Sequence, residues 1–484
     1  MVAAQTHPAV DELRQIVGPN GVLDDADELV VYECDAFPIA RGRPLAVVFP
    51  IDTQQVAECV KVLVRHDIQI VPRGSGTGLA GGAVTYDQGV LVCTSRMNRI
   101  ETIDLDNRLA IVQAGVRNLA LTDALAGTGF HFSPDPSSQR ASSIGGNAST
   151  NAGGINTLKH GVTTNHVLGV ELVLADGTIL QTRNSPLYDG IGPDLPGLIC
   201  GHEGTFGIVT RIWCRLVPRP RHVRTVYAIF DSVASACKTV SDTIAEGILP
   251  TSMEMMDGSM IQIIEGAFHI GFPPDAVAML LIEIDGIDQI LDEQLDQILH
   301  IAQENGAQSV EGCSDEARRA SLWSARKKAF GAVGRVSHSY CTQDACVPRS
   351  LLPQVMEQVA AIGREHDIQI TNVFHAGDGN IHPILLFDED DPEQVQRTLR
   401  ASQQILDYCI DVGGTITGEH GVGVEKMHLM ARMFNPQTIQ TFKAIKDTFD
   451  PDHRINDAKK IPSDTTYVEL VKNVAPNVPG GAMA

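Results

Sequence analysis

A glycine-rich loop between two apolar segments restricts the folds that this chain can form. The run Pro72–Gly82 contains a formal G-x-G-x-x-G pattern, which in a Rossmann fold follows a strand and leads directly into a helix. Here the helical spacing of apolar residues precedes the loop, over 53–66, and a strand-like run at 89–94 follows it. The nicotinamide interpretation therefore fails. The closely spaced backbone N–H groups favour an anion-binding loop instead, with a tight structural turn as the alternative.

Two further runs of small residues, 142–154 and 201–209, follow in the first half of the chain. Small residues let the backbone approach a large flat ligand closely. Three such loops predict a large, extended cofactor.

Short strands and helices alternate up to Pro218-Arg219-Pro220, where we place a domain boundary. Beyond it, the pattern predicts a second unit of mixed α+β type and then a region in which helices dominate. The expected strands are 68–71, 89–94, 110–113, 167–174, 207–216, 226–230 and 279–284, and the expected helices are 53–66, 235–247, 353–366 and 392–412.

The formal charge of -22 comes from 59 acidic and 37 basic residues. It argues against a nucleic-acid binder and means that an anionic substrate needs a local group of Arg or Lys. Residues 1–19 lack the apolar core of a signal peptide, and no later run approaches about 18 apolar residues. We therefore expect a soluble, cytoplasmic protein, with any membrane contact peripheral and made through partner subunits.

Ten cysteines are scattered between Cys34 and Cys409 without a Cys-x-x-Cys pair. This spacing predicts reduced, mostly buried thiols and excludes a standard ferredoxin-type iron-sulfur cluster. If the chain transfers electrons, the iron-sulfur relay lies in another subunit.

Two histidines, His375 and His382, stand symmetrically about Asp378-Gly379. Asp-Gly predicts a two-residue hairpin turn, which would place the histidines directly opposite each other with Cβ atoms about 5 Å apart. The later run Gly418-Glu419-His420-Gly421 adds a carboxylate and a third imidazole. Because imidazole and carboxylate bind zinc and similar divalent ions, the two runs together predict a metal site. Two hydrogen-bonded histidines near a surface turn are the alternative.

Together these residues resemble the PCMH-type flavin-binding domain of the vanillyl-alcohol-oxidase superfamily. Within it, the chain is similar to the FAD-linked oxidases that include the bacterial glycolate oxidase D subunit and the D-lactate and D-2-hydroxyglutarate dehydrogenases. The resemblance runs from Tyr32 to Lys460. Its motifs are Pro72–Gly82, Pro134–Ser138, Ile144–Asn147, Glu203–Thr205, Glu254–Asp257, Trp323-x-x-Arg326-Lys327, His375–His382 and Gly418–Gly421.

The resemblance implies an α+β chain, with a PCMH-type FAD-binding domain of two subdomains and an α+β, ferredoxin-like C-terminal domain for substrate and metal. We expect an N-terminal segment at 1–43, the FAD-binding domain at 44–220, the substrate domain at 221–461 and a flexible tail at 462–484.

The resemblance also implies FAD, and we expect it to be held non-covalently because the first loop has no histidine for a covalent link. The residues expected to contact FAD are Pro72, Arg73, Gly74, Ser75, Gly76, Thr77, Gly78, Leu79, Gly82, Pro134, Asp135, Ser138, Gly145, Gly146, Asn147, Ala152, Gly153, Glu203, Gly204, Gly207, Ile208 and Asn456.

For the second site, the resemblance implies that His375, His382 and Glu419 bind a divalent metal, zinc above all, and that His420 is the catalytic base. We expect Arg326 to bind the substrate carboxylate, because its guanidinium can contact both oxygens. Lys327 and Lys328 are weaker candidates. A cation on a surface helix is the alternative for Arg326.

Three positions depart from the family pattern. The closing Asn-Pro-Gly-Lys of the family is Asn456-Asp457-Ala458-Lys459 here, which puts the turn under the flavin in question. His202 replaces a common Ser, and His160 stands where Tyr usually precedes Gly161.

The expected activity is the oxidation of a small D-2-hydroxy acid, glycolate or D-lactate, to its 2-oxo acid. Electrons would pass from FAD to a second flavin-domain subunit and an iron-sulfur subunit, and then to the quinone pool. Two alternatives are a metal-dependent hydrolase, which leaves the three glycine-rich loops without a role, and a non-catalytic flavin-carrying subunit. We expect no nucleic-acid partner and no membrane span.

Overall fold

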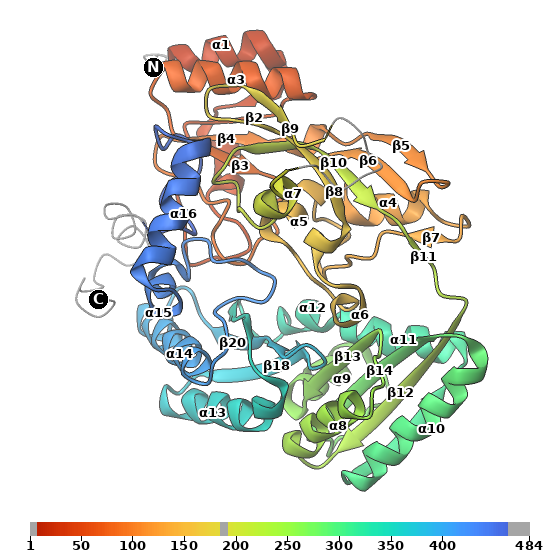
Figure 1. Ribbon diagram of the computed structural model, residues 1–484. Helices are drawn as coiled ribbons and strands as arrows, with labels where there is room; N and C mark the ends of the chain where they lie inside the picture. Colours follow the sequence, from red (N-terminus) through yellow and green to blue (C-terminus); the bar gives the residue numbers. More distant parts are fainter. Residues whose placement is uncertain (1–6, 184–191, 463–484) are drawn as a thin grey trace. The chain divides into compact units, whose positions relative to one another are not determined.

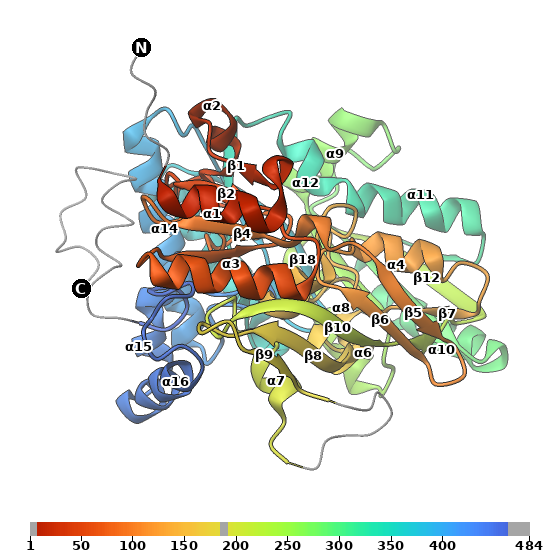
Figure 2. The ribbon, with the colours of Figure 1, turned by 90° about the horizontal axis from the view of Figure 1, so that it is seen from above.

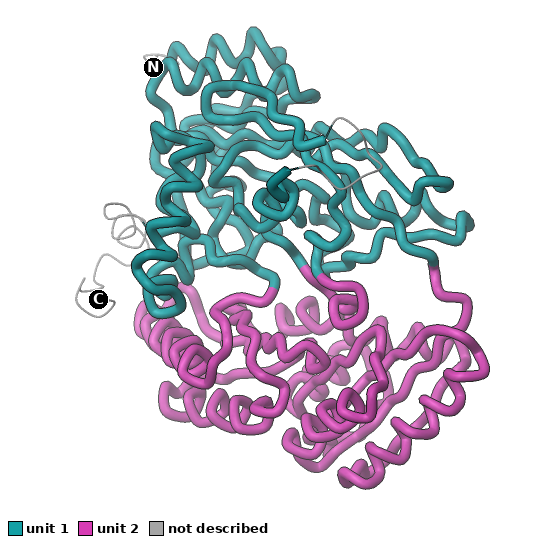
Figure 3. Tube along the Cα trace, viewed as in Figure 1, with its two compact units in different colours: residues 1–152, 162–218, 419–484 teal, residues 153–161, 219–418 magenta. Residues whose placement is uncertain are grey.

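The computed structural model describes residues 7–183 and 192–462. It divides into two compact units, of which unit 1 comprises 1–152, 162–218 and 419–484, and unit 2 comprises 153–161 and 219–418 (Figure 3). Residues 419–461 thus group with the glycine-rich loops, whereas the expected domains placed them with 221–418. Nearly all of the expected tail, 462–484, lies outside the described residues. Within the described ranges, no helix has the length and apolar character needed to cross a bilayer.

Unit 1 begins with a four-stranded sheet in the order β1-β2-β4-β3. Strands β2, β4 and β3 are parallel, and α3 connects β2 to β3. Helix α3 begins where Asp52 accepts the N–H of Gln55, and its apolar face packs with α1 on the sheet (Figures 1 and 2). The bounds are β1 Val22–Leu23, β2 Ala46–Val48, β3 Ile70–Arg73, β4 Val90–Cys93, α1 Pro8–Val17, α2 Ala26–Leu29 and α3 Thr53–Arg65.

A second sheet of unit 1 has the order β5-β6-β10-β8-β9 and is antiparallel throughout. Its apolar face packs on α4, α5 and α7, so the two sheets form the two subdomains expected of a PCMH-type domain. The bounds are β5 Ile100–Asp104, β6 Leu109–Gln113, β7 Phe130–His131, β8 Val167–Val173, β9 Ile179–Gln181, β10 Ile208–Arg215, β11 Val217–Pro218, α4 Asn118–Ala124, α5 Ile144–Thr150, α7 Leu195–Ile199, α15 Met430–Met433 and α16 Pro436–Phe449.

Unit 2 is built on one large sheet, with β15-β12-β14-β13-β18-β19-β17 in order and β16 and β20 attached through β18. Helices α9, α11 and α12 bury one of its faces, and α8, α10 and α13 pack against its strands (Figure 1). The strands are β12 His222–Phe230, β13 Ser252–Asp257, β14 Ala278–Gly286, β15 Ala307–Cys313, β16 Ser339–Thr342, β17 Ala345–Cys346, β18 Gln369–His375, β19 Asn380–Ile381 and β20 Pro383–Phe387. The helices are α6 Thr157–His160, α8 Val233–Ala245, α9 Gly258–Phe268, α10 Asp288–Glu304, α11 Glu316–Lys327, α12 Ala329–Val333, α13 Leu352–Glu365 and α14 Pro392–Asp411.

The elements expected from the sequence are present, with ends that differ by a few residues. The largest difference is at β12, which begins at His222 rather than at Val226. The α+β class is confirmed.

Candidate functional site

The first glycine-rich loop joins the parallel strands β3 and β4, so that it leads into a strand and not into a helix. Arg73 lies beneath the loop: its guanidinium donates to the carbonyl oxygens of Cys34 and Ala83 and lies over the Tyr32 ring. A Cβ at Gly76 would meet this guanidinium at 2.2 Å, and the φ of Gly76 is +70°. Arg73 therefore holds the loop in place from its inner side. The outer side of the loop consists mainly of backbone atoms.

The open face of this loop is at Gly78. A Cβ there would have a single neighbour within 4 Å, the Asp35 carboxylate oxygen at 3.7 Å. Asp35 is itself buried and accepts the N–H groups of Phe37 and Ala83. Burial raises the pKa of Asp35, and these two N–H groups only partly offset that rise.

The second glycine-rich loop packs directly on the first, since a Cβ at Gly74 would lie 2.5 Å from the Ser143 hydroxyl. Helix α5 begins after Ser143, whose side chain accepts the N–H of Gly146. Asn147 on this helix is 4% exposed, and its Nδ2 has no hydrogen-bond partner among the residues that the structure describes. A buried amide donor without a partner is costly, so the two loops fit a ligand that supplies an acceptor.

The third loop holds another segment of unit 1 through Glu203. Its carboxylate accepts the N–H of Val422 at 2.9 Å and the N–H of Gly423 at 2.7 Å. A Cβ at Gly421 would lie 2.9 Å from the same carboxylate. Glu203 therefore fixes the turn that directly follows Glu419 and His420 in the chain, which the sequence did not indicate.

The altered closing segment forms its turn without the family's Pro and Gly. Asn456 Nδ2 donates to the carbonyl oxygens of Gly82 and Glu203, and Lys459 Nζ donates to those of Gly82 and Val84. Asn456 and Ala458 have φ of +47° and +50°. Burial lowers the pKa of Lys459 to about 7. The first and third loops are thus tied together by this segment.

The expected hairpin register at the two histidines is wrong. His375 pairs with Asn380, because the loop 376–379 has four residues instead of two, and Asp378 accepts the N–H of Asn380. The same register continues to Asn372 opposite Pro383, which leaves His382 on a position diagonal to His375. A shift of two residues keeps both side chains on one face. The two imidazole centroids lie 5.2 Å apart at 82°, so the histidines still meet.

Asp344 adds a carboxylate to the group of histidines. The sequence did not indicate this residue. It is fully buried; Oδ2 accepts the Thr417 hydroxyl at 2.5 Å and the N–H of Gly418 at 3.0 Å, and Oδ1 lies 3.5 Å from His382 Nε2. A Cβ at Gly418 would lie 2.5 Å from the Asn380 amide. The segment leading into Glu419 is therefore held against the histidine loop.

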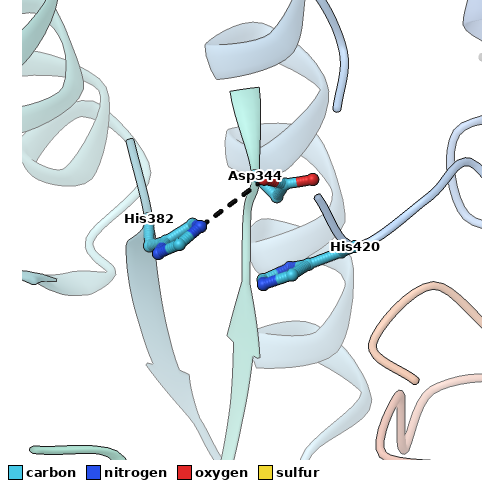
Figure 4. A group of neighbouring side chains, drawn as sticks. All are labelled: Asp344, His382 and His420. Atoms are coloured by element: carbon cyan, nitrogen blue, oxygen red, sulfur yellow. Dashed lines mark ion pairs between the residues drawn. The ribbon is translucent and has the colours of Figure 1, made fainter. Parts of the chain in front are cut away.

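Among residues 7–183 and 192–462, two overlapping groups of side chains have the chemistry of a metal site. One is His375, His382 and Glu419, and the other is Asp344, His382 and His420. In each group the potential ligand atoms lie within 4.8 Å of one another. Figure 4 shows the side chains of the second group converging. Imidazole and carboxylate donors in this number suit zinc or a similar divalent ion.

Arg326 lies on the buried face of α11 and forms an ion pair. Its Nε donates to Glu254 Oε2 at 2.8 Å, and its Nη2 lies 2.6 Å from the same oxygen. The other oxygen, Oε1, lies 2.6 Å from His375 Nδ1. Burial raises the pKa of Glu254, but Arg326 and His375 outweigh burial and hold it below its ordinary value.

The weaker candidates for the substrate carboxylate, Lys327 and Lys328, have exposed side chains. Lys328 Nζ lies over the Phe268 ring. The surface-cation alternative for Arg326 is wrong, because Arg326 is 1% exposed.

Two family models match the chain. The FAD binding domain covers residues 44–183, and the C-terminal domain of FAD linked oxidases covers residues 219–459. Among curated relatives, the chain is 43% identical to the glycolate oxidase subunit GlcD of Escherichia coli (strain K12), over 93% of this chain and 90% of that protein.

It is also 30% identical to the D-lactate dehydrogenase of Archaeoglobus fulgidus, over 93% of this chain and 99% of that protein. Among solved structures, 4-ethylphenol oxidase from Gulosibacter chungangensis superposes with a TM-score of 0.79 at 21% identity, over 94% and 97% of the two chains. The last similarity shows the fold alone.

Proposed function

This chain belongs to the FAD-linked oxidase family, and from that premise we propose that it is an FAD-dependent dehydrogenase of small 2-hydroxy acids. Glycolate, which would give glyoxylate, and D-lactate, which would give pyruvate, are the proposed substrates. Relatives similar over more than nine tenths of this chain are a glycolate oxidase subunit and a D-lactate dehydrogenase. The observation in this chain that carries the proposal is the combination of glycine-rich loops with the histidine and carboxylate group.

The three loops fit FAD because they offer backbone with little side-chain cover. Gly78 leaves open space, and the buried Nδ2 of Asn147 needs an acceptor. We propose that the first loop holds the pyrophosphate through its backbone N–H groups. The first loop has no histidine, so the FAD is proposed to be non-covalent.

The metal ligands proposed are His375, His382 and Glu419, with zinc as the ion. Their burial and donor chemistry fit a divalent ion, because a buried group of imidazole and carboxylate donors is otherwise expensive to keep together.

The proposed reaction removes a hydride from the substrate Cα and a proton from its hydroxyl. When bound, FAD supplies the two-electron acceptor, and a divalent ion supplies a positive charge that lowers the pKa of the hydroxyl. His420 accepts the hydroxyl proton, because histidine is the side chain that most often serves as a general base. Arg326 holds the carboxylate through the guanidinium edge that does not face Glu254. The product is the 2-oxo acid.

We propose that 44–220 binds FAD and that 221–461 is the substrate domain, as the two family models divide the chain, although 419–461 packs with unit 1. Because the Escherichia coli relative is named as a subunit, we propose that this chain also works with partners. A second flavin-domain subunit and an iron-sulfur subunit would carry electrons to the quinone pool and keep the chain at the inner face of the cell membrane.

Anaerobic mixing of the FAD-loaded, metal-loaded chain with a panel of D- and L-2-hydroxy acids tests the activity. We expect flavin bleaching by glycolate or D-lactate and little or none by L-lactate. A flavin that no 2-hydroxy acid reduces would contradict the proposal and favour a subunit that only carries flavin.

A further inference from the structure

Glu254 is a buried carboxylate in the middle of the large sheet of unit 2. It lies on β13, opposite Leu281 of β14 on one side and opposite His375 of β18 on the other. Its side chain is 1% exposed. An ionised carboxylate in such a place is unfavourable unless partners compensate for its burial, so its partners indicate what it does.

One oxygen of Glu254 orients His375. Oε1 lies 2.6 Å from Nδ1, and a carboxylate that already faces a guanidinium can only accept. Nδ1 must therefore carry a proton, and in the neutral imidazole this leaves the lone pair on Nε2. A lone pair on Nε2 is what a metal ion requires, and carboxylate partners of this kind orient histidine ligands in many metal sites.

The other oxygen holds Arg326. Nε donates to Oε2 at 2.8 Å and Nη2 lies 2.6 Å from it, with both residues buried. One carboxylate thus touches both the proposed metal ligand and the proposed carboxylate-binding residue. The pairing of β13 with β18 fixes Glu254 against His375, and the ion pair fixes Arg326 against the same Glu254.

We propose that Glu254 is a positioning residue that presents His375 Nε2 to a divalent metal and fixes Arg326 at a set distance from it. This inference rests on the proposed function. It gives a reason for selecting acids whose hydroxyl stands on the carbon next to the carboxylate: the hydroxyl and the carboxylate must reach two groups that cannot move apart.

The test compares Glu254→Gln and Glu254→Asp with the wild type and with Asp257→Asn, all as FAD-loaded protein. Asp257 is a matched control, since it is a carboxylate on the same strand that accepts the N–H of Met260 and the Asn372 amide and faces none of the proposed site residues. Zinc affinity is measured by competition with a chromophoric chelator, and the KM and kcat of flavin reduction are measured with a 2-hydroxy acid.

Glu254→Gln can donate from its amide to Nδ1 and move the imidazole proton to Nε2. We expect zinc affinity to fall about 10–100-fold, with KM raised and flavin content unchanged. Glu254→Asp keeps the charge and should recover part of the zinc affinity. Asp257→Asn should bind zinc as the wild type does.

Equal zinc affinity in the wild type and Glu254→Gln would overturn the inference, and so would equal losses of zinc and FAD in Glu254→Gln and Asp257→Asn. If Glu254→Gln does not fold, wild-type zinc affinity and KM in Glu254→Asp would overturn it. A wild-type chain that binds no zinc would contradict the proposed function itself, so the two failures are distinguishable.

Discussion

Lys459 Nζ donates to Asn456 Oδ1 at 2.7 Å, across a turn that the family closes with Asn-Pro-Gly-Lys. Ala458 takes the place of the glycine and has a φ of +50°. A non-glycine residue in the left-handed region destabilises the fold by about 1–2 kcal/mol, and Ala458 is such a residue. The hydrogen bonds of Asn456 and Lys459 to the first and third loops offset this destabilisation.

Replacing Ala458 by Gly should therefore stabilise the protein by about 1 kcal/mol, because glycine adopts this φ without strain. The matched control is Ala444→Gly, an exposed position inside helix α16. There the same substitution should destabilise by about 1 kcal/mol. Urea unfolding of the two variants measures both effects, and a loss of stability in Ala458→Gly would show that the turn is not strained.

His202 should make the stability of the protein depend on pH. Burial, with a smaller contribution from Lys460 and Lys446, lowers its pKa from 6.5 to about 3. Its Nδ1 accepts the N–H of Phe206 at 3.3 Å, which a protonated ring could not do. The unfolded chain takes up a proton below its pKa of 6.5 while the folded chain does not, so stability is greatest above pH 6.5 and falls as the pH decreases.

Between pH 7 and pH 5 this residue alone should cost about 2 kcal/mol. His202→Ser lacks the imidazole, so its unfolding free energy should decrease less over the same interval. Denaturant unfolding at both pH values gives the comparison. Identical pH dependence in the two proteins would mean that folding does not lower the pKa of His202.

Gly78 and Gly81 should separate cofactor binding from folding. Gly78→Val places its side chain on the open face of the first loop, so we expect loss of FAD with the melting temperature of the apoprotein unchanged. Gly81→Val should lose FAD and should also have a lower melting temperature. The φ of Gly81 is +73°, and a Cβ there would meet Val424 at 2.5 Å. Gly266→Val, on a helix position with no neighbour within 4 Å, is the control. Full FAD retention in Gly78→Val would show that the loop is only a turn.

Flavin should leave the wild-type polypeptide on acid or heat denaturation, and iron and acid-labile sulfide should be absent from the purified chain. The first expectation follows from a first loop without histidine, and the second from cysteines without a cluster spacing. Absorbance of the supernatant and of the pellet measures the flavin, and colorimetric assays measure iron and sulfide. Flavin that stays with the polypeptide would contradict non-covalent binding.

The sequence indicated local elements and their composition well, because helical and strand periodicity are local properties. It could not indicate Glu254 or Asp344 as partners of the histidine group, since strand pairing joins residues far apart in the chain. The Asp-Gly turn was read with two residues too few in the loop. The predicted register was therefore shifted by two residues. Because side chains alternate between the two faces with a period of two, His375 and His382 still lie on the same face.

The segment that carries Glu419 and His420 also has contacts that the sequence could not indicate. Glycines flank both residues in the sequence, but nothing in it shows that the buried carboxylates Asp344 and Glu203 hold the backbone on either side. Those contacts depend on how separate segments pack, which composition and spacing do not encode.

Anaerobic flavin reduction in His382→Ala, beside wild type and His420→Ala, tests the central claim most directly. His382 lies 5.2 Å from His375 between ring centroids and is common to both potential metal groups. We predict that His382→Ala keeps FAD, loses metal and is no longer bleached by a 2-hydroxy acid. His420→Ala should keep FAD and metal but reduce its flavin about 10²–10⁴-fold more slowly, as expected for loss of a general base. A His382→Ala protein that is reduced at nearly the wild-type rate would show that the histidines are structural and would contradict the proposed mechanism.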